Sequence, residues 1–303
     1  MNNMLKTIIT AGIMACALGA CTKAQLISDL PEDINKPEES TSVTTTAKRG
    51  VCQSTSTSDF GQKLVDLKAN WYYTWGLTPS ITVDGVEFVP MFWGASSVTE
   101  DNCNAVNKLF EEGKISYVLG FNEPDLAAES NMSVEEALDL WAFLCEHLDS
   151  RIKLVSPAPS YPTRDWLDQF MTGVSQRGLR CDYVAVHMYA GIGTDNYQNV
   201  IKEVYNKYGK KIWITEFAPR DDNAKQNGYN SYSESRVLSQ MQILLPAYEE
   251  MSEVFRYSWF GCASDTMIGL VSSRFFGDDG QITSLGEYYA SIEPNENISL
   301  AEY

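Results

Sequence analysis

Eight short apolar segments run through the chain, and they restrict the possible folds more than any other feature of the sequence. Most of them lack strict alternation between apolar and polar residues, which is typical of strands buried on both faces of a parallel sheet. The sequence therefore predicts eight buried parallel strands. They span residues 50–52, 71–75, 88–93, 117–121, 153–157, 183–189, 211–217 and 255–260.

Amphipathic helical patterns separate these segments. The clearest spans residues 133–148, where Ser133 and Glu136 have the spacing of a capping box and apolar residues recur every three or four positions. Residues 78–85, after the second strand, are predicted to form a loop instead of a helix. Further helices are predicted over residues 59–68, 102–112, 163–176, 196–208, 233–251 and 284–292.

Eight strands that alternate with helices over roughly 240 residues predict an α/β fold, a (β/α)8 TIM-like barrel that forms a single domain. A doubly wound open sheet is the alternative. That fold usually has fewer strands and a glycine-rich phosphate loop after the first strand, and the sequence has no such loop there. The barrel is therefore the preferred prediction.

The N-terminal residues are predicted to be a targeting signal and not part of the fold. Lys6 is the only charge in the first twenty residues, and the apolar run 7–18 is too short to span a bilayer as a mature helix. The run ends in Leu18-Gly19-Ala20-Cys21, which resembles the lipobox of bacterial lipoproteins. The resemblance implies cleavage before Cys21 and acylation of its thiol. An ordinary signal peptide that happens to contain a cysteine is the alternative.

These patterns divide the chain into four parts. Residues 1–20 are the predicted lipoprotein signal peptide, and residues 21–48 are polar and too poor in apolar residues to fold, so we expect a disordered tether. Residues 49–293 form the predicted barrel domain, and residues 294–303 form a C-terminal tail. We expect a monomer anchored by its lipid in the bacterial cell envelope, at the outer membrane or the cell surface.

Charge and cysteine content exclude several classes of function. The formal net charge of −17 repels phosphate backbones, so nucleic acid is not expected as a partner. Of the seven cysteines, Cys16 leaves with the signal and Cys21 is acylated, so five remain. Because five is odd, at least one should be unpaired. No CxxC spacing occurs, and we expect neither a metal site nor an organic cofactor.

Two glutamates follow strands that are distant in sequence. Glu123 lies just after the fourth predicted strand, and Glu216 lies near the end of the seventh. Barrel enzymes place their chemistry at the carboxyl ends of the strands, so the two side chains should meet. Glycoside cleavage needs such a pair of carboxyl groups. Taken singly, Glu123 could be a helix-entry carboxylate and Glu216 a salt-bridge partner, but their pairing favours catalysis.

The sequence around each glutamate resembles the active-site signatures of the retaining clan of barrel glycosidases. The signatures are Asn122-Glu123-Pro124 at the fourth strand and Thr215-Glu216 at the seventh. The resemblance implies that Glu123 is the acid/base and Glu216 the nucleophile. It also implies that Asn122 bonds to the 2-hydroxyl of the cleaved sugar.

A longer ordered set of motifs resembles glycoside hydrolase family 128, whose members are small barrels active on β-1,3-glucans. The resemblance covers nearly the whole predicted domain. It implies a retaining hydrolase that cleaves laminarin-like β-1,3-glucan by double displacement, with endo action expected. The motifs are residues 48–51, 71–75, 88–91, 118–125, 130–137, 155–158, 186–187, 189, 213–218 and 284–290, and Met188 and the stretch 262–283 depart from them.

Three other functions remain open. The enzyme could act from chain ends or on oligosaccharides only, it could be a transglycosylase, or the barrel could be a surface glycan-binding protein without catalysis. The last is disfavoured because capture alone needs no pair of carboxyl groups at the strand ends. Double displacement requires a protonated Glu123, an ionised Glu216 and carboxyl groups about 5–5.5 Å apart, whereas inversion requires about 6.5–9.5 Å.

Further residues at strand ends are candidates for substrate binding. His187 and Tyr189 end the sixth strand, where they could orient a carboxylate or contact a sugar hydroxyl. Tryptophan rings can stack on the C–H faces of a pyranose, although any of them could instead belong to the core. The remaining candidates are Asp125, Trp71, Trp75, Trp93 and Trp259.

Overall fold

A computed structural model describes residues 47–54 and 59–295, which lie in one compact unit. The predicted signal peptide, the lipidation site Cys21, nearly all of the tether and most of the C-terminal tail lie outside the described residues. None of the helices within the described ranges is long and apolar enough to cross a membrane.

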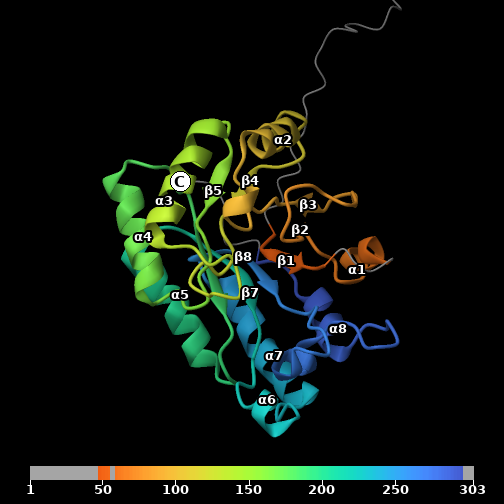
Figure 1. Cartoon of the computed structure of the whole chain (residues 1–303). Coiled ribbons are helices and arrows are strands. Elements are labelled where there is room, and N and C mark those ends of the chain that lie inside the picture. Colours follow the sequence, from red (N-terminus) through yellow and green to blue (C-terminus); the bar gives the residue numbers. More distant parts are fainter. Residues whose placement is uncertain (1–46, 55–58, 296–303) are drawn as a thin grey trace, which may run out of the picture. The chain divides into compact units, whose positions relative to one another are not determined.

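Eight parallel strands form a (β/α)8 barrel (Figure 1). Six of them are hydrogen-bonded in the order β3-β2-β1-β8-β7-β6, and β4 pairs with β5. Single bridges from Met91 to Leu119 and from Val155 to Tyr183 join these two groups into a closed ring. The strands are β1 (Arg49–Cys52), β2 (Trp71–Tyr73), β3 (Glu87–Phe88), β4 (Tyr117–Leu119), β5 (Lys153–Val155), β6 (Val184–Met188), β7 (Ile212–Phe217) and β8 (Val254–Trp259).

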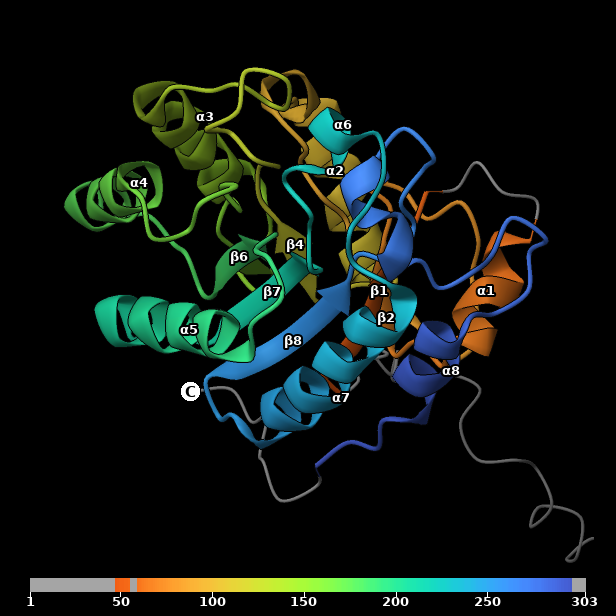
Figure 2. The same cartoon turned by 90° about the horizontal axis from the view of Figure 1, so that it is seen from below.

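Helices surround the strands, as Figure 2 shows for α3, α4, α5 and α7. No helix lies between β2 and β3, so the predicted loop over residues 78–85 is confirmed. Short 3-10 helices, η1 (Ala95–Ser97) and η2 (Ile268–Ser273), follow β3 and β8. The α-helices are α1 (Phe60–Asp66), α2 (Glu100–Glu111), α3 (Val134–His147), α4 (Asp165–Gln176), α5 (Thr194–Tyr208), α6 (Ala224–Asn227), α7 (Glu234–Glu250) and α8 (Ser284–Ser291).

Local capping residues fix several helix ends, including the start of α3 predicted at Ser133. The side chain of Ser133 accepts a hydrogen bond from the backbone N–H of Glu136, which fixes the start of α3. Ser233 caps α7 in the same way, and the left-handed Gly209 ends α5. These helices come after β4, β6 and β7, the strands that carry the candidate site.

A buried ion pair lies inside the amino-terminal part of the barrel. The Arg256 guanidinium is 2.6 Å from the Glu87 carboxylate, and both side chains are completely buried. The rings of Trp71, Tyr117 and Trp213 lie 4.6 to 5.6 Å from that guanidinium. The aromatic faces and one carboxylate therefore compensate the arginine for the water that it loses on burial.

The thiols of the barrel are unpaired. Among the described residues, all the cysteines are free, which agrees with the expectation that at least one would be. They are Cys52, Cys103, Cys145, Cys181 and Cys262.

Candidate active site

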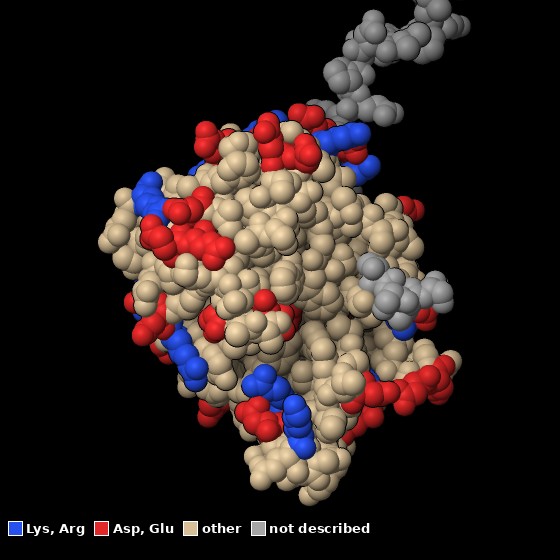
Figure 3. Space-filling view, in the orientation of Figure 1, with Lys and Arg blue, Asp and Glu red and all other residues tan. Residues whose placement is uncertain are grey.

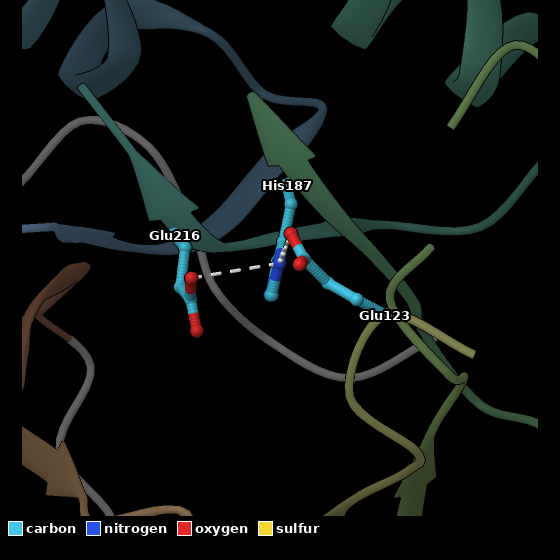
Figure 4. Close-up of side chains that lie close together, drawn as sticks. All are labelled: Glu123, His187 and Glu216. Carbon is cyan, nitrogen blue, oxygen red and sulfur yellow. Dashed lines mark hydrogen bonds and ion pairs between the residues drawn. The ribbon is translucent and has the colours of Figure 1, made fainter. Parts of the chain in front are cut away.

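Glu123, His187 and Glu216 meet at the carboxyl ends of the strands (Figure 4). His187 Nδ1 is 3.1 Å from Glu123 Oε1 and 3.6 Å from Glu216 Oε2. Each residue offers one atom that could bind a metal ion, a carboxylate oxygen or an imidazole nitrogen, and these three atoms lie within 4.8 Å of one another. The predicted meeting of the two glutamates across one site is therefore observed, and the same three side chains could also hold a metal ion.

The backbone around these residues is irregular, and this irregularity aims the side chains. Glu123 has a φ of 39°, a left-handed conformation that is uncommon for a residue other than glycine. Its N–H donates to the carbonyl of Ala158, and its own carbonyl accepts from Leu126, which holds the strained turn in place. The register between β6 and β7 shifts beside His187, which turns that side chain toward the glutamates.

Three neutral donors surround the carboxylate of Glu216. Trp75 Nε1 donates to it at 2.8 Å, the Tyr73 hydroxyl at 3.1 Å and the Tyr189 hydroxyl at 2.5 Å. Burial, together with the charge of Glu216, raises the pKa of Tyr73 and of Tyr189 well above the usual value. Both phenols therefore keep their protons at neutral pH and remain donors to Glu216.

His187 is fully buried between the two carboxylates. Burial opposes its protonation, but the charge of Glu216 and the hydrogen bond to Glu123 outweigh burial, and the net effect is a raised pKa. The glutamates on either side of the imidazole therefore favour its protonated form. Its Nε2 has no hydrogen-bond partner among the described residues.

The glutamates remain open to a ligand. The side chain of Glu123 is 12% exposed and that of Glu216 is 6% exposed, so neither is sealed inside the protein. On the face drawn in Figure 3, large areas carry neither acidic nor basic side chains, with a small acidic group near the centre and a mixed basic and acidic cluster below it.

Four further predicted site residues lie close to the glutamates or in the turn that carries them. Trp75 and Tyr189 donate hydrogen bonds to Glu216. The backbone carbonyl of the half-buried Trp93 accepts a hydrogen bond from the backbone N–H of Asn122. Asp125 instead accepts hydrogen bonds from the N–H and the hydroxyl of Ser160. Its carboxylate therefore connects the segments after β4 and β5.

The prediction that Trp71 and Trp259 contact sugar is wrong, because both side chains are fully buried. Trp71 begins β2, so it lies deep in the barrel, and its indole donates to the carbonyl of Lys48. Trp259 ends β8, but η2 lies against it and Ser273 accepts its indole N–H. Both rings belong to the core.

Sequence reasoning missed Tyr73 and Glu129. Tyr73 lies two residues from Trp71 and from Trp75, so the period-two rule for strands could have identified it. Glu129 lies in the loop after β4, where it accepts a hydrogen bond from the amide of Asn122 at 3.2 Å. No periodic pattern marks a residue in such a loop.

A family model and a known relative match most of the chain. The family model of the glycosyl hydrolase catalytic core matches residues 50–289. Alkali-sensitive linkage protein 1 of Schizosaccharomyces pombe is 31% identical over 252 residues, or 80% of this chain. The chain spans only 44% of the length of that relative.

Solved structures resemble the chain over most of its length. A subgroup I endo-β-1,3-glucanase of glycoside hydrolase family 128 from Amycolatopsis mediterranei, in complex with laminarihexaose, is 33% identical with a TM-score of 0.71. The match covers 82% of this chain and 100% of that one. A subgroup III curdlan-specific exo-β-1,3-glucanase from Blastomyces gilchristii is 25% identical with a TM-score of 0.62, covering 81% and 98%.

Proposed function

The chain belongs to the family of glycosyl hydrolase catalytic cores, and we propose that it cleaves β-1,3-glucan chains internally by double displacement with retention. The observation that carries this proposal is the approach of Glu123 to Glu216, with one oxygen of each within 4.8 Å. Carboxyl oxygens this close leave little room between them for the water molecule that inversion needs, which favours retention.

The first half of the reaction transfers a sugar to the protein. Glu123 donates its proton to the glycosidic oxygen, and the bond between that oxygen and the anomeric carbon breaks. Glu216 attacks the same carbon and forms a covalent glycosyl-enzyme. The donors Tyr73, Trp75 and Tyr189 hold the Glu216 carboxylate in position for this attack.

The second half releases the sugar. Glu123, now ionised, removes a proton from water, and the resulting nucleophile attacks the anomeric carbon from the side that the leaving group left. The bond to Glu216 breaks and its carboxylate is restored. Two inversions at one carbon give net retention. His187 contacts both glutamates and would keep them aligned through the two steps.

The decisive experiment follows product size and anomeric configuration with linear β-1,3-glucan as substrate. NMR of the first product should show the β-anomer, and chromatography should show mixed short oligosaccharides early in the time course. The α-anomer as first product would contradict retention. Release of glucose or a single short product from the start would favour exo action, which the similarity to the Blastomyces exo-enzyme keeps as the second candidate.

Variants of Glu123 test its role as acid/base. Glu123→Ala should lose activity on polymer by orders of magnitude, and azide should restore turnover of a substrate with an activated leaving group. Glu136→Ala, at an exposed position on α3, is the matched control. Products longer than the starting oligosaccharide would indicate a transglycosylase, and binding without any cleavage would indicate a glycan-capture protein.

We also propose that Cys21 carries a lipid that holds the enzyme, as a monomer, in a bacterial cell envelope. The order of charge, apolar run, small residues and cysteine in residues 1–21 supports this. The full chain expressed in a bacterium should incorporate labelled palmitate and partition into detergent, and Cys21→Ser should do neither. Equal labelling of the two proteins would contradict acylation at Cys21.

A further inference from the structure

A third carboxylate, Glu129, lies beside the proposed catalytic pair. It is partly buried, and it accepts a hydrogen bond from Asn122 Nδ2 at 3.2 Å. Asn122 itself is 5% exposed and immediately precedes Glu123. Glu129 therefore bonds to the residue that directly precedes the proposed acid/base.

The loop after β4 holds Glu129 in this position. Two left-handed residues, Glu123 with a φ of 39° and Asn131 with a φ of 46°, bend the chain on either side of it. The N–H of Glu129 donates to Leu126, and the N–H of the next residue, Ser130, donates to the carbonyl of Asn122. These contacts return the chain to the point from which it left β4.

Burial and the charges nearby act on Glu129. Burial raises its pKa first, and the charges of Glu123 and Glu216 raise it further, while Asn122 and His187 act in the opposite direction. Glu129 therefore shares the electrostatic environment of the two catalytic candidates, although neither of them bonds to it directly in the structure.

The chemistry of a carboxylate determines which way the Asn122 amide faces. In the structure the amide turns its nitrogen toward Glu129, whose carboxyl oxygen accepts the hydrogen bond. The oxygen Oδ1 is then turned away, and it is buried without a partner among the described residues. Nδ2 carries two hydrogens, and Glu129 accepts one of them, so the other can be donated to a ligand.

We propose that Glu129 is a positioning residue, which fixes the Asn122 amide so that its second N–H donates to the 2-hydroxyl of the sugar being cleaved. This inference rests on the function proposed above. Bonds to the 2-hydroxyl strengthen in the transition state of retaining glycosidases, so the orientation of this amide affects the rate more than substrate binding.

Two substitutions separate the hydrogen bond from the charge. Glu129→Ala removes the acceptor and should lower kcat by roughly tenfold to a hundredfold, the range expected for a lost hydrogen bond to a charged group, with little change in KM. Glu129→Gln retains an acceptor oxygen and should restore most of that loss. Glu136→Gln removes the same charge at an exposed position on α3 and should match the wild type.

A substrate without the 2-hydroxyl provides a readout that a merely structural role would not affect. An aryl β-1,3-linked disaccharide and its 2-deoxy analogue at the cleaved sugar should be compared in the wild type and in Glu129→Ala. The penalty should appear with the parent substrate and largely vanish with the analogue, because the lost contact is already absent there. Equal penalties with both substrates, or no penalty with either, would overturn the proposal.

NMR tests the same contact without activity. The side-chain amide signals of Asn122 should shift in Glu129→Ala and stay near their wild-type positions in Glu129→Gln and Glu136→Gln. Unchanged signals in Glu129→Ala would overturn the positioning role even in an active enzyme. An inactive wild type with the expected shifts would instead contradict the proposed function while leaving the amide contact established.

Discussion

Two buried carboxylates at different depths of the barrel have opposite surroundings. Glu87 begins β3 and is 1% exposed, and Glu216 lies near the end of β7 and is 5% exposed. Glu87 faces the guanidinium of Arg256 at 2.6 Å. Glu216 instead receives hydrogen bonds from two phenols and an indole, and its nearest cationic group is the imidazole of His187.

This difference in partners suits one carboxylate to a role in stability and the other to a role in catalysis. A carboxylate paired with arginine has its charge neutralised by a permanent cation, and breaking such a buried pair is costly. Neutral donors orient a carboxylate and leave its negative charge available for a positively charged transition state. The barrel thus uses the same functional group as a structural element near its amino-terminal end and as a proposed nucleophile near its carboxyl-terminal end.

Removal of Glu216 should have the largest effect. Glu216→Ala is expected to lower the rate on β-1,3-glucan by roughly 10,000-fold or more, because the covalent step loses its nucleophile. The free energy of unfolding, measured in urea, should fall less than in Glu87→Gln, because the groups left without an acceptor are neutral phenols and an indole and no arginine loses its counterion. A variant within tenfold of wild-type activity would show that Glu216 is not the nucleophile.

Removal of Glu87 should have the converse effect. Glu87→Gln leaves the buried Arg256 without its counterion and should lower the free energy of unfolding by about 3–5 kcal/mol. Turnover per folded molecule should remain near the wild-type value. The double variant Glu87→Leu with Arg256→Met should recover much of the lost stability, since neither charge then remains buried. Unchanged stability in Glu87→Gln would contradict a structural role for the pair.

The catalytic candidates could be predicted from sequence because strand order converts sequence position into spatial position. Glu123 and Glu216 are distant in sequence, but parallel strands of a barrel deliver their ends to one face. The helices were predicted for a similar reason, since periodicity and caps are local signals. Ser133, for example, begins α3 through a bond to a residue only three positions away.

Depth within the barrel could not be predicted. Trp71 and Trp75 lie in one apolar segment, yet Trp71 is buried while Trp75 contacts Glu216, because β2 ends at Tyr73. Strand length and stagger, which decide depth, leave no mark in the residue pattern. The burial of Trp259 is unpredictable for another reason, because the segment that covers it, η2, lies in a long irregular stretch after β8.

Two tyrosines that each donate to a buried glutamate allow a finer comparison of the candidate site with the structural core. Tyr189 donates to Glu216 at 2.5 Å, and Tyr257 donates to the buried Glu249 at 2.6 Å. Tyr189→Phe should lower kcat by roughly tenfold to a hundredfold with a smaller change in stability. Tyr257→Phe should instead lower the free energy of unfolding by about 1–3 kcal/mol and leave kcat unchanged. Equal effects of the two variants on kcat would contradict the distinction between a catalytic and a structural carboxylate.

The titration of His187 should show the smallest effect and the most direct link to Glu216. Because Glu216 and Glu123 raise its pKa against the opposing effect of burial, NMR should place the His187 midpoint above 6.5, with the signal assigned through His187→Gln. Glu216→Gln should lower that midpoint, while Glu87→Gln should leave it in place.

The same shift predicts how stability depends on pH. A raised folded-state pKa means that protonation of His187 favours the folded state, fully below pH 6.5, and that this contribution is lost as pH rises through the folded-state pKa. His187→Gln should therefore flatten the fall in the free energy of unfolding across that interval. If Glu87→Gln moved the midpoint as far as Glu216→Gln does, the field of Glu216 would not be confined to the carboxyl ends of the strands, and the two carboxylates could not be treated as separate environments.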